Sequence, residues 1–283
     1  MSSRRRILLA FLCFSALLVC SNLPGMADPA VPASEAAAID RETGILISYL
    51  RLGDMSLPRP RGDPPAVSQE EALRRAREFL ERVGVEPRAP WVLTEARYQD
   101  AGTIAFYTFL WRKYFHGLRL PAWIDVVIDA DSGEVESYIL QDDPVLVPLT
   151  PRVGAAEAIK RVAEHQGYRR WIVRKVELIV SYEPPYPGPQ VLAWWIELIN
   201  PDARTLSESE VLARVNAQTG VVISAAMPAS ASPIDPDSRS RLAEKAAAND
   251  DALPKLDLEA IAKGPIPPTI FELAQRKGTR RRR

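Results

Sequence analysis

The stretch "IDADSGEVESY" at residues 128–138 decides the fold, because the chain repeats its plan twice more. "IDRETGILISY" at 39–49 and "VNAQTGVVISA" at 215–225 also contain Asp or Asn, two variable residues, Thr or Ser, glycine and then alternating apolar residues. An Asp or Asn side chain accepts hydrogen bonds from the backbone two residues on, and glycine adopts the left-handed conformation that reverses a hairpin. We therefore expect three hairpins with structural turns formed by Asp40, Thr43, Gly44, Asp129, Ser132, Gly133, Asn216, Thr219 and Gly220.

Helices precede two of these hairpins. The segment "SQEEALRRAREFLERVG" at 68–84 has apolar residues at helical spacing, and Ser68 and Glu71 are predicted to form a capping box. Its partner is "TPRVGAAEAIKRVAEHQG" at 150–167, with Thr150 as the expected cap. A third segment, 237–249, also has a helical pattern, but no strands follow it.

Each of the first two helices is followed by a strand that begins with tryptophan, at 91–99 and 171–182, and then by a very apolar strand, at 104–111 and 191–199. This order predicts an α+β fold of tandem units, each with one helix packed on an antiparallel β-sheet. Because the apolar strands have apolar residues on both faces, the second face also needs cover. Either the two sheets pack on each other, or one presents a surface to a partner.

The predicted organisation has five parts. Their boundaries follow from the repeat, from a proline-rich stretch near residue 60 and from the composition of the two ends. The parts are a signal peptide (1–27), a leading hairpin with a proline-rich linker (28–66), unit 1 (67–145), unit 2 (146–228) and a partly helical or disordered tail with a basic end (229–283).

The N-terminus has the three features of a secretory signal. Arginines at 4–6 precede the apolar run 7–20, and small residues lead to a predicted cleavage site after Ala27. The run is short for a membrane span, although an uncleaved anchor is an alternative. Cleavage before Cys20 as a lipoprotein is disfavoured, because Val19 stands where a small residue is expected. The protein is thus expected to be extracytoplasmic, either secreted or associated with the cell envelope.

Composition narrows the chemistry of the mature chain. Cys13 and Cys20 both lie in the predicted signal, so no disulfide, thiolate nucleophile or cysteine-ligated metal is expected. Residues 28–270 contain 27 basic and 35 acidic residues, a net charge of −8, which argues against binding of nucleic acid. The terminal "RKGTRRRR" at 276–283 is a basic tail that could contact an anionic envelope polymer.

The residues that follow the first apolar strand resemble a known family. The passage "FHGLRLPAWIDVVIDADSGEVESY" at 115–138, with His116-Gly117 at a turn before the last hairpin, resembles PepSY domains and more closely the YcdB/YcdC-type repeats of exported bacterial proteins. The third copy of the motif departs from the family, because Asn216 replaces the acid. The resemblance implies an exported binding module that restrains peptidases or cell-wall hydrolases, and it implies no catalytic residues.

A search for reactive residues finds no constellation. His116 and His165 are not at metal-ligand spacing. The sequence "DADSG" at 129–133 is similar to a calcium loop, but the sibling turns "DRETG" and "NAQTG" lose acids and keep glycine, which favours a turn. The tryptophans could stack on sugars or peptides, and the adjacent Trp194 and Trp195 must point to opposite faces of their strand.

These observations lead to two expectations for function. The first is an exported, non-catalytic binding protein that restrains a peptidase or wall hydrolase or assists its folding, with a protein as its partner. The second is a structural scaffold of the envelope that uses the basic tail. An enzyme is disfavoured, and we expect no catalytic residues, no cofactor and no metal site.

Overall fold

The structure of the protein is a computed structural model that describes residues 35–43, 45–51, 64–87, 89–100, 104–166, 171–185, 187–200, 209–226 and 254–273. Several predicted features lie outside these residues. They are the signal peptide, Gly44, most of the proline-rich linker, the helix at 237–249 and the basic tail at 276–283. Within the described residues, no helix is long and apolar enough to cross a membrane.

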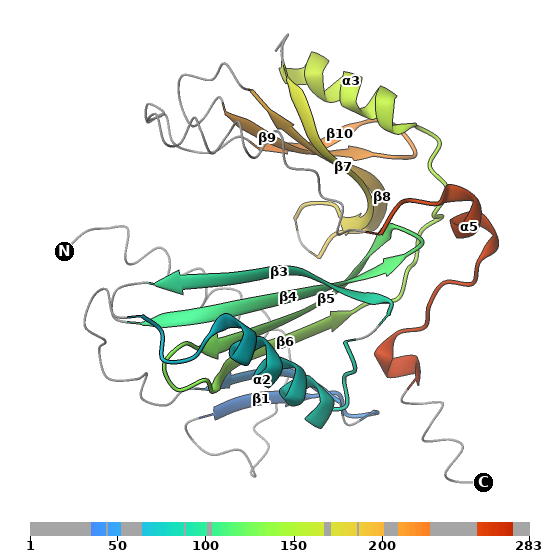
Figure 1. The fold of residues 1–283 in the computed structure, drawn as a ribbon. Coiled ribbons are helices and arrows are strands. Elements are labelled where there is room, and N and C mark those ends of the chain that lie inside the picture. The colour runs from blue at the N-terminus through green and yellow to red at the C-terminus, as the bar shows by residue number, and fades with distance from the viewer. Residues whose placement is uncertain are drawn as a thin grey trace, which may run out of the picture.

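The described elements alternate as the repeat predicts (Figure 1). A leading hairpin precedes two units, and a short helix follows them. We call α2 with β3–β6 unit 1, and α3 with β7–β10 unit 2. The elements are β1 (Glu35–Ile39), β2 (Leu46–Arg51), α2 (Gln69–Arg82), β3 (Trp91–Asp100), β4 (Ala105–Phe115), β5 (Leu118–Asp129), β6 (Val135–Asp142), α3 (Ala155–Gln166), β7 (Ile172–Tyr182), β8 (Gln190–Ile199), β9 (Glu210–Asn216), β10 (Val222–Ala226) and α5 (Leu258–Lys263).

The α+β class is confirmed, but the strands form a larger sheet than the tandem units predict. All ten strands belong to one sheet. Unit 1 with the leading hairpin has the order β3-β4-β5-β6-β2-β1, and unit 2 has the order β7-β8-β9-β10. The two parts join where Arg119 of β5 pairs in parallel with Ile179 of β7, whereas the other pairings are antiparallel. The expectation of one antiparallel sheet per unit is therefore wrong in this respect.

Both long helices lie on the same face of this continuous sheet. Helix α2 contacts β4 and β5, and α3 contacts β8, β9 and β10. In Figure 1 the two parts of the sheet are inclined toward each other, with α2 and α3 on the outside. We call the helix-bearing side the outer face and the opposite side the inner face. Because the two parts of the sheet are inclined, the inner faces of the two units face each other.

Helix α2 is capped largely as predicted. The Ser68 Oγ accepts a hydrogen bond from the Glu71 N–H at 3.2 Å. Within the described chain, the Glu71 carboxylate contacts Arg74 and Arg75 of its own helix instead of the Ser68 N–H, so the predicted capping box is only half formed. Gly84 ends the helix in the left-handed region, with φ +81°.

Helix α3 begins later than predicted. It starts at Ala155, five residues after the expected cap Thr150. The cause is a competing set of backbone hydrogen bonds. The N–H groups of Arg152 and Val153 both donate to the carbonyl of Ala217, each at 2.9 Å, which holds this segment against the β9–β10 turn. The first helical bond instead runs from Ala158 to the Gly154 carbonyl.

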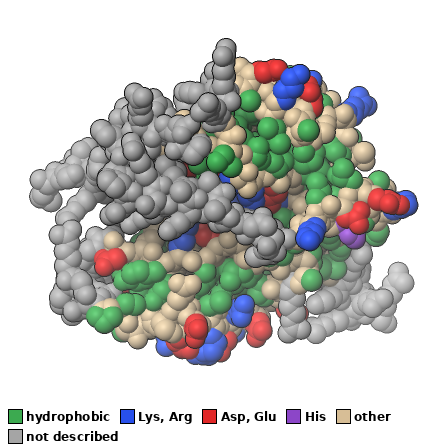
Figure 2. All heavy atoms as spheres, turned by 45° about the horizontal axis from the view of Figure 1, so that its top comes forward, with side chains coloured by type: hydrophobic (Ala, Val, Ile, Leu, Met, Phe, Trp, Pro, Cys, Tyr) green, Lys and Arg blue, Asp and Glu red, His purple; other side chains and the backbone are tan. Residues whose placement is uncertain are grey.

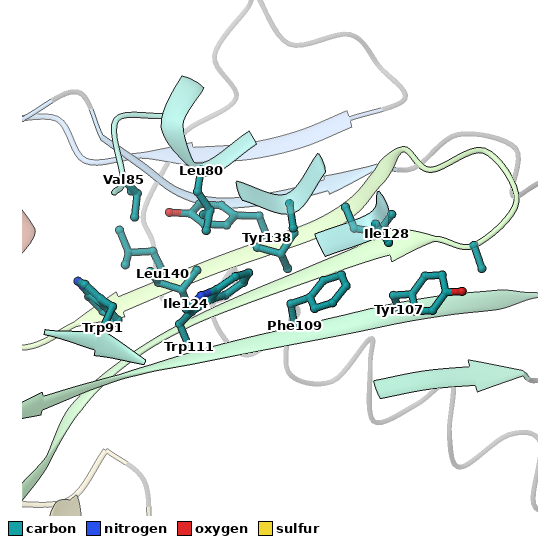
Figure 3. Packing of buried hydrophobic residues seen from close by; sticks show 14 of the residues in the cluster. Leu80, Val85, Trp91, Tyr107, Phe109, Trp111, Ile124, Ile128, Tyr138 and Leu140 are labelled. Carbon is teal, nitrogen blue, oxygen red and sulfur yellow. The ribbon is translucent and has the colours of Figure 1, made fainter. Parts of the chain in front are cut away.

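Two apolar cores lie between the helices and the outer face of the sheet. The unit 1 core fills with aromatic and aliphatic side chains that alternate along β4, β5 and β6 (Figure 3). Leu80 of α2 and Phe109, Ile124 and Tyr138 of the sheet are completely buried there. The unit 2 core is built in the same way. It contains Ala158, Val162, Leu178, Leu192, Trp194, Ile196, Leu198, Val211, Ala213 and Val215.

The chain returns to the outer face after unit 2. We call residues 254–273 the C-terminal strap. Ile261 of α5 is 4% exposed in the unit 2 core, whereas Ile270 and Phe271 pack on the unit 1 core. The Asp257 N–H also donates to the carbonyl of His116 at 2.9 Å. The strap thus bridges both units across their junction, an arrangement that the pattern of the tail did not predict.

The His116-Gly117 turn lies under this strap. Both residues have positive φ, +49° and +81°, as a two-residue β4–β5 hairpin requires. A Cβ on Gly117 would collide with the backbone of Lys255 and Leu256. The glycine is therefore needed both for the turn and for the close approach of the strap.

Candidate binding face

The turn residues of the central motif form a local hydrogen-bond network. Asp129 Oδ1 accepts from the N–H of Asp131 at 2.9 Å and from the N–H and Oγ of Ser132 at 2.6 and 3.0 Å. Gly133 follows with φ +71°, and its N–H donates to the Asp129 carbonyl. The hydrogen bonds that Asp129 Oδ1 accepts from Asp131 and Ser132 lie within the turn, which is consistent with the structural interpretation.

The sibling turns repeat this network. Asn216 Oδ1 accepts from the N–H groups of Gln218 and Thr219 at 2.9 and 3.0 Å. In the leading hairpin, Asp40 Oδ1 accepts from the N–H and the hydroxyl of Thr43. A neutral amide therefore substitutes for a carboxylate in the third copy, because only an acceptor oxygen is required.

An arginine from α2 holds the unit 1 turn, and the sequence did not single it out. Arg75 Nη1 donates to the Ser132 carbonyl at 2.9 Å, and Glu71 orients the guanidinium by an ion pair at 2.8 Å. The arginine lies directly over Gly133, where any Cβ would collide with it. The spacing of Glu71 and Arg75, four apart on a helix, is the signal that could have identified this contact.

Unit 2 contains the same contact. Arg161 Nη1 of α3 donates to the Thr219 carbonyl at 3.1 Å, and Glu157 pairs with Arg161 at 2.9 Å. Gly220, with φ +75°, lies beneath this guanidinium, and a Cβ there would again collide with it. The helix and the hairpin of each unit are therefore fastened by the same arginine–glycine contact.

The other polar candidates take structural positions. His116 lies in the β4–β5 turn and His165 in the last turn of α3. Glu134 and Glu136, which follow the turn glycine of unit 1, pair with Arg51 of the leading hairpin. Across the described part of the chain, no three His, Cys, Asp or Glu side chains are grouped as metal ligands would be.

Many charged side chains of the continuous sheet lie on its inner face. Alternation places them opposite the residues that fill the cores. Figure 2 shows acidic and basic side chains between the apolar surfaces of the two parts of the molecule. The inner-face residues considered below are Glu95, Arg112, Tyr114, Arg119, Trp123, Asp125, Arg174, Lys175, Glu177, Trp195, Glu197 and Arg214.

A polar cluster at the junction of the units centres on Glu177. Its carboxylate accepts a hydrogen bond from the Tyr114 hydroxyl at 2.7 Å and pairs with Arg119 at 3.0 Å and Lys175 at 3.7 Å. Glu177 is 6% exposed, and burial together with this carboxylate raises the pKa of Tyr114. Because a buried carboxylate needs partners, this cluster is expected to stabilise the angle between the units.

Beside this cluster lie two charged groups with unmet hydrogen-bonding capacity. Among the described residues, no hydrogen bond or ion pair engages the guanidinium of Arg112. Burial, and secondarily the charge of Arg119, lowers the pKa of Arg112. On the neighbouring strand, Asp125 Oδ1 is buried and accepts no hydrogen bond from the described residues. Burial, reinforced by the charge of Glu95, raises the pKa of Asp125 to about 6.

Two tryptophans flank these groups. Trp123 pairs with Arg112 across β4 and β5, and its Nε1 donates to Gln141. Trp195 lies in unit 2 with Arg119 over its ring, 5.5 Å from the centroid. Both rings are only partly buried, whereas the adjacent Trp194 is 3% exposed in the outer core. The prediction that Trp194 and Trp195 point to opposite faces is confirmed.

A second buried charge pair lies on the outer face at the strap. Lys113 Nζ donates to both carboxylate oxygens of Asp142, at 3.0 and 3.2 Å, and to the Pro268 carbonyl at 2.8 Å. Asp142 also accepts the Ile270 N–H at 2.6 Å. All four groups are mutually satisfied, so this pair is part of the packing of the strap.

Comparisons with known proteins give distant likenesses. No protein-family model matches the sequence, and no curated protein matches it. The C-terminal domain of Bacillus megaterium YpeB is 15% identical with a TM-score of 0.46, over 71% of this chain and 80% of that chain. A "putative lipoprotein" (CD1622) of Clostridium difficile 630 is 14% identical with a TM-score of 0.22, over 58% of this chain and 95% of that chain. Neither likeness is close enough to carry an argument about function.

Proposed function

We propose that the protein is an extracytoplasmic, non-catalytic binding protein of the PepSY type, which engages a peptidase or wall hydrolase and restrains it or assists its folding. The N-terminal signal pattern supports the location, and the repeated turn motif supports the PepSY assignment. The inner face is the surface that we assign to the partner.

One observation carries this proposal, namely that Arg112 and Asp125, opposite charges on neighbouring strands, form no hydrogen bond or ion pair with each other or with the other described residues. At the equivalent positions, 87 residues later, unit 2 has Ile199 and Leu212. Since unit 2 forms the same strands with apolar residues there, the fold does not require the two charges. Partly buried charges without partners cost stability, so their presence is best explained by a ligand that pairs with them.

The test is capture of the partner followed by a measurement of activity. The full chain is immobilised, extracytoplasmic proteins of the source organism are passed over it, and a retained hydrolase or peptidase is purified and assayed with and without the protein. We expect the protein to slow the enzyme, or to raise its refolding yield. The matched variant Arg112→Ile/Asp125→Leu, which has the residues of unit 2, should lose both retention and effect.

Three outcomes would contradict the proposal. The first is that no peptidase or hydrolase is retained, and the second is that a retained enzyme is unaffected. In the third, the wild type and the matched variant retain the enzyme equally, which would show that the inner face is not used.

A further inference from the structure

We infer that the inner face binds an extended acidic peptide segment of the partner, with a side-chain carboxylate of that segment paired with Arg112. This inference rests on the proposed function and names the chemistry of the partner.

Most inner-face charges are paired within the protein. Glu177 pairs with Arg119 and Lys175, and Glu197 pairs with Arg174 at 2.5 Å. On β3, Glu95 pairs with Arg97 at 2.8 Å. These pairs leave Asp125 as the carboxylate beside Arg112. Burial raises the pKa of Asp125 and the charge of Arg112 partly offsets that rise, but no hydrogen bond or ion pair joins the two side chains among the described residues.

A second inner-face arginine also lacks a carboxylate. Among the described residues, the Arg214 guanidinium donates to neutral oxygens, namely the hydroxyls of Ser224 and Ser181 at 2.9 and 3.0 Å and the Tyr182 carbonyl at 3.0 Å. Its charge is therefore not neutralised. Two guanidinium groups that form no ion pair among the described residues make the inner face complementary to a negatively charged ligand.

The two arginines terminate a continuous row across both units. Arg112 lies close enough to Arg119 for the charge of one to affect the pKa of the other. Arg119 lies over Trp195, and Trp195 pairs with Arg214 across β8 and β9. An extended segment laid along this row would cross five strands, β4, β5, β7, β8 and β9, and its apolar side chains could rest on the tryptophan rings.

The Asp125 Oδ1 atom, which accepts no hydrogen bond from the described residues, specifies the ligand further. Asp125 lies diagonally across from Arg112, since it pairs with Leu110 in the β4–β5 register. Together they present an unmet acceptor beside an unmet cation. A glutamate or aspartate residue in an extended segment supplies the complement, because its side chain is an anion and its backbone N–H is a donor.

The experiment measures peptide binding to the full chain by fluorescence anisotropy. The probe is a fluorescein-labelled peptide of alternating alanine and glutamate, and the controls have glutamine or lysine in place of glutamate. We expect the glutamate peptide to bind about 10-fold more tightly than the glutamine peptide, as one charge-assisted bidentate contact allows. Arg112→Gln and Arg112→Ile should each remove this preference. Arg77→Gln, which removes an exposed charge from the outer side of α2, should leave it unchanged.

Equal binding of the glutamate and glutamine peptides, or a preference that survives both Arg112 variants, would overturn the inference. A second arm identifies what lies on the face. A photo-crosslinking residue in place of Leu110 should label the glutamate peptide. Cross-links to the segment 227–253 of the chain itself, which the peptide does not suppress, would show that the protein's own segment is the occupant, and would also overturn the inference.

The inference and the proposed function can fail separately. If retention of the captured enzyme requires Arg112 but the glutamate and glutamine peptides bind equally, the inference of an acidic segment fails and the proposed function stands. If glutamate peptides bind through Arg112 but no peptidase or hydrolase is captured, the inference stands and the proposed function fails.

Discussion

Units 1 and 2 close their helices onto their sheets with equivalent contacts made by different residues. In unit 1 the Tyr107 hydroxyl donates to the Val67 carbonyl at 2.8 Å, and in unit 2 the Trp194 indole donates to the Val153 carbonyl at 2.7 Å. Each valine lies just before its helix. A phenol and an indole thus perform one task, because the position needs only a large buried ring with a donor at its edge.

The units differ on the inner face and at the junction. Arg112 and Asp125 of unit 1 correspond to Ile199 and Leu212 of unit 2. Similarly, the buried Lys113 has a polar, uncharged counterpart, Asn200. The helix–turn contacts that both units share therefore belong to the fold. Of the charges found only in unit 1, Lys113 contacts the strap, and Arg112 and Asp125 are the ones for which we propose a ligand. Four sets of substitutions test this division between the units.

The largest loss of stability is expected at the buried ion pair of Lys113 and Asp142 in unit 1. Lys113→Met leaves the Asp142 carboxylate buried without its cation, which should cost about 3–5 kcal/mol of unfolding free energy at neutral pH. Chemical denaturation measures this loss. The double variant Lys113→Met/Asp142→Leu should recover most of it, since both charges are removed together. A double variant as unstable as the single one would show that the pair is needed for more than mutual neutralisation.

The next effect should be equal in the two units. Gly133→Ala and Gly220→Ala each force a Cβ against an arginine at positive φ, and each should cost about 1–3 kcal/mol. Gly154→Ala is the matched control, because nothing lies within 4 Å of the added Cβ. Thermal unfolding of the three variants checks this. A large loss in one unit only would break the equivalence of the turns.

Asp125 should destabilise the protein in a pH-dependent way. Its folded-state pKa of about 6 lies above the ordinary aspartate pKa of 3.8, so the folded state holds the proton more tightly. This group therefore makes stability fall as the pH rises from about 4 to 6. Asp125→Asn should gain about 1–3 kcal/mol at pH 7 and almost nothing at pH 3. Urea denaturation of both proteins across this range measures the difference, and a gain that is independent of pH would contradict the assignment.

The smallest effect is expected at the two arginines over the turns. Arg75→Gln and Arg161→Gln remove partly exposed ion pairs and one carbonyl contact each, so each should lower Tm by no more than about 2 °C. Differential scanning calorimetry can resolve this. The two shifts should match within error, and a shift in one unit alone would indicate that the other arginine is not engaged in solution.

Much of the fold could be predicted because its signals are local. The apolar run at 104–111 predicts a strand, and the structure extends that strand to Phe115. The glycines at 133 and 220 predict turns of positive φ, which the structure contains. The start of α3 could not be predicted from the cap pattern at Thr150, because hydrogen bonds to Ala217, far along the chain, hold that segment out of the helix.

The candidate site was largely beyond prediction. Adjacent Trp194 and Trp195 indicate that one ring must leave the core, since neighbouring residues of a strand face opposite sides. Nothing local indicates that Arg112 and Asp125 lie side by side, or that both lack partners. These facts depend on the register of β4 and β5 and on the burial of the inner face.

The amino-acid sequence by itself determined the repeated hairpins, the two amphipathic helices, the order of the strands along the chain and the α+β class. These follow from periodicity and turn preference, which act over a few residues. Tertiary structure alone decided that the units share one sheet, that the strap fastens them and that unmatched charges meet on the inner face. The junction rests on a single parallel pairing, Arg119 with Ile179, and such long-range pairing is selected by the packing of whole units, which leaves no periodic trace in the chain.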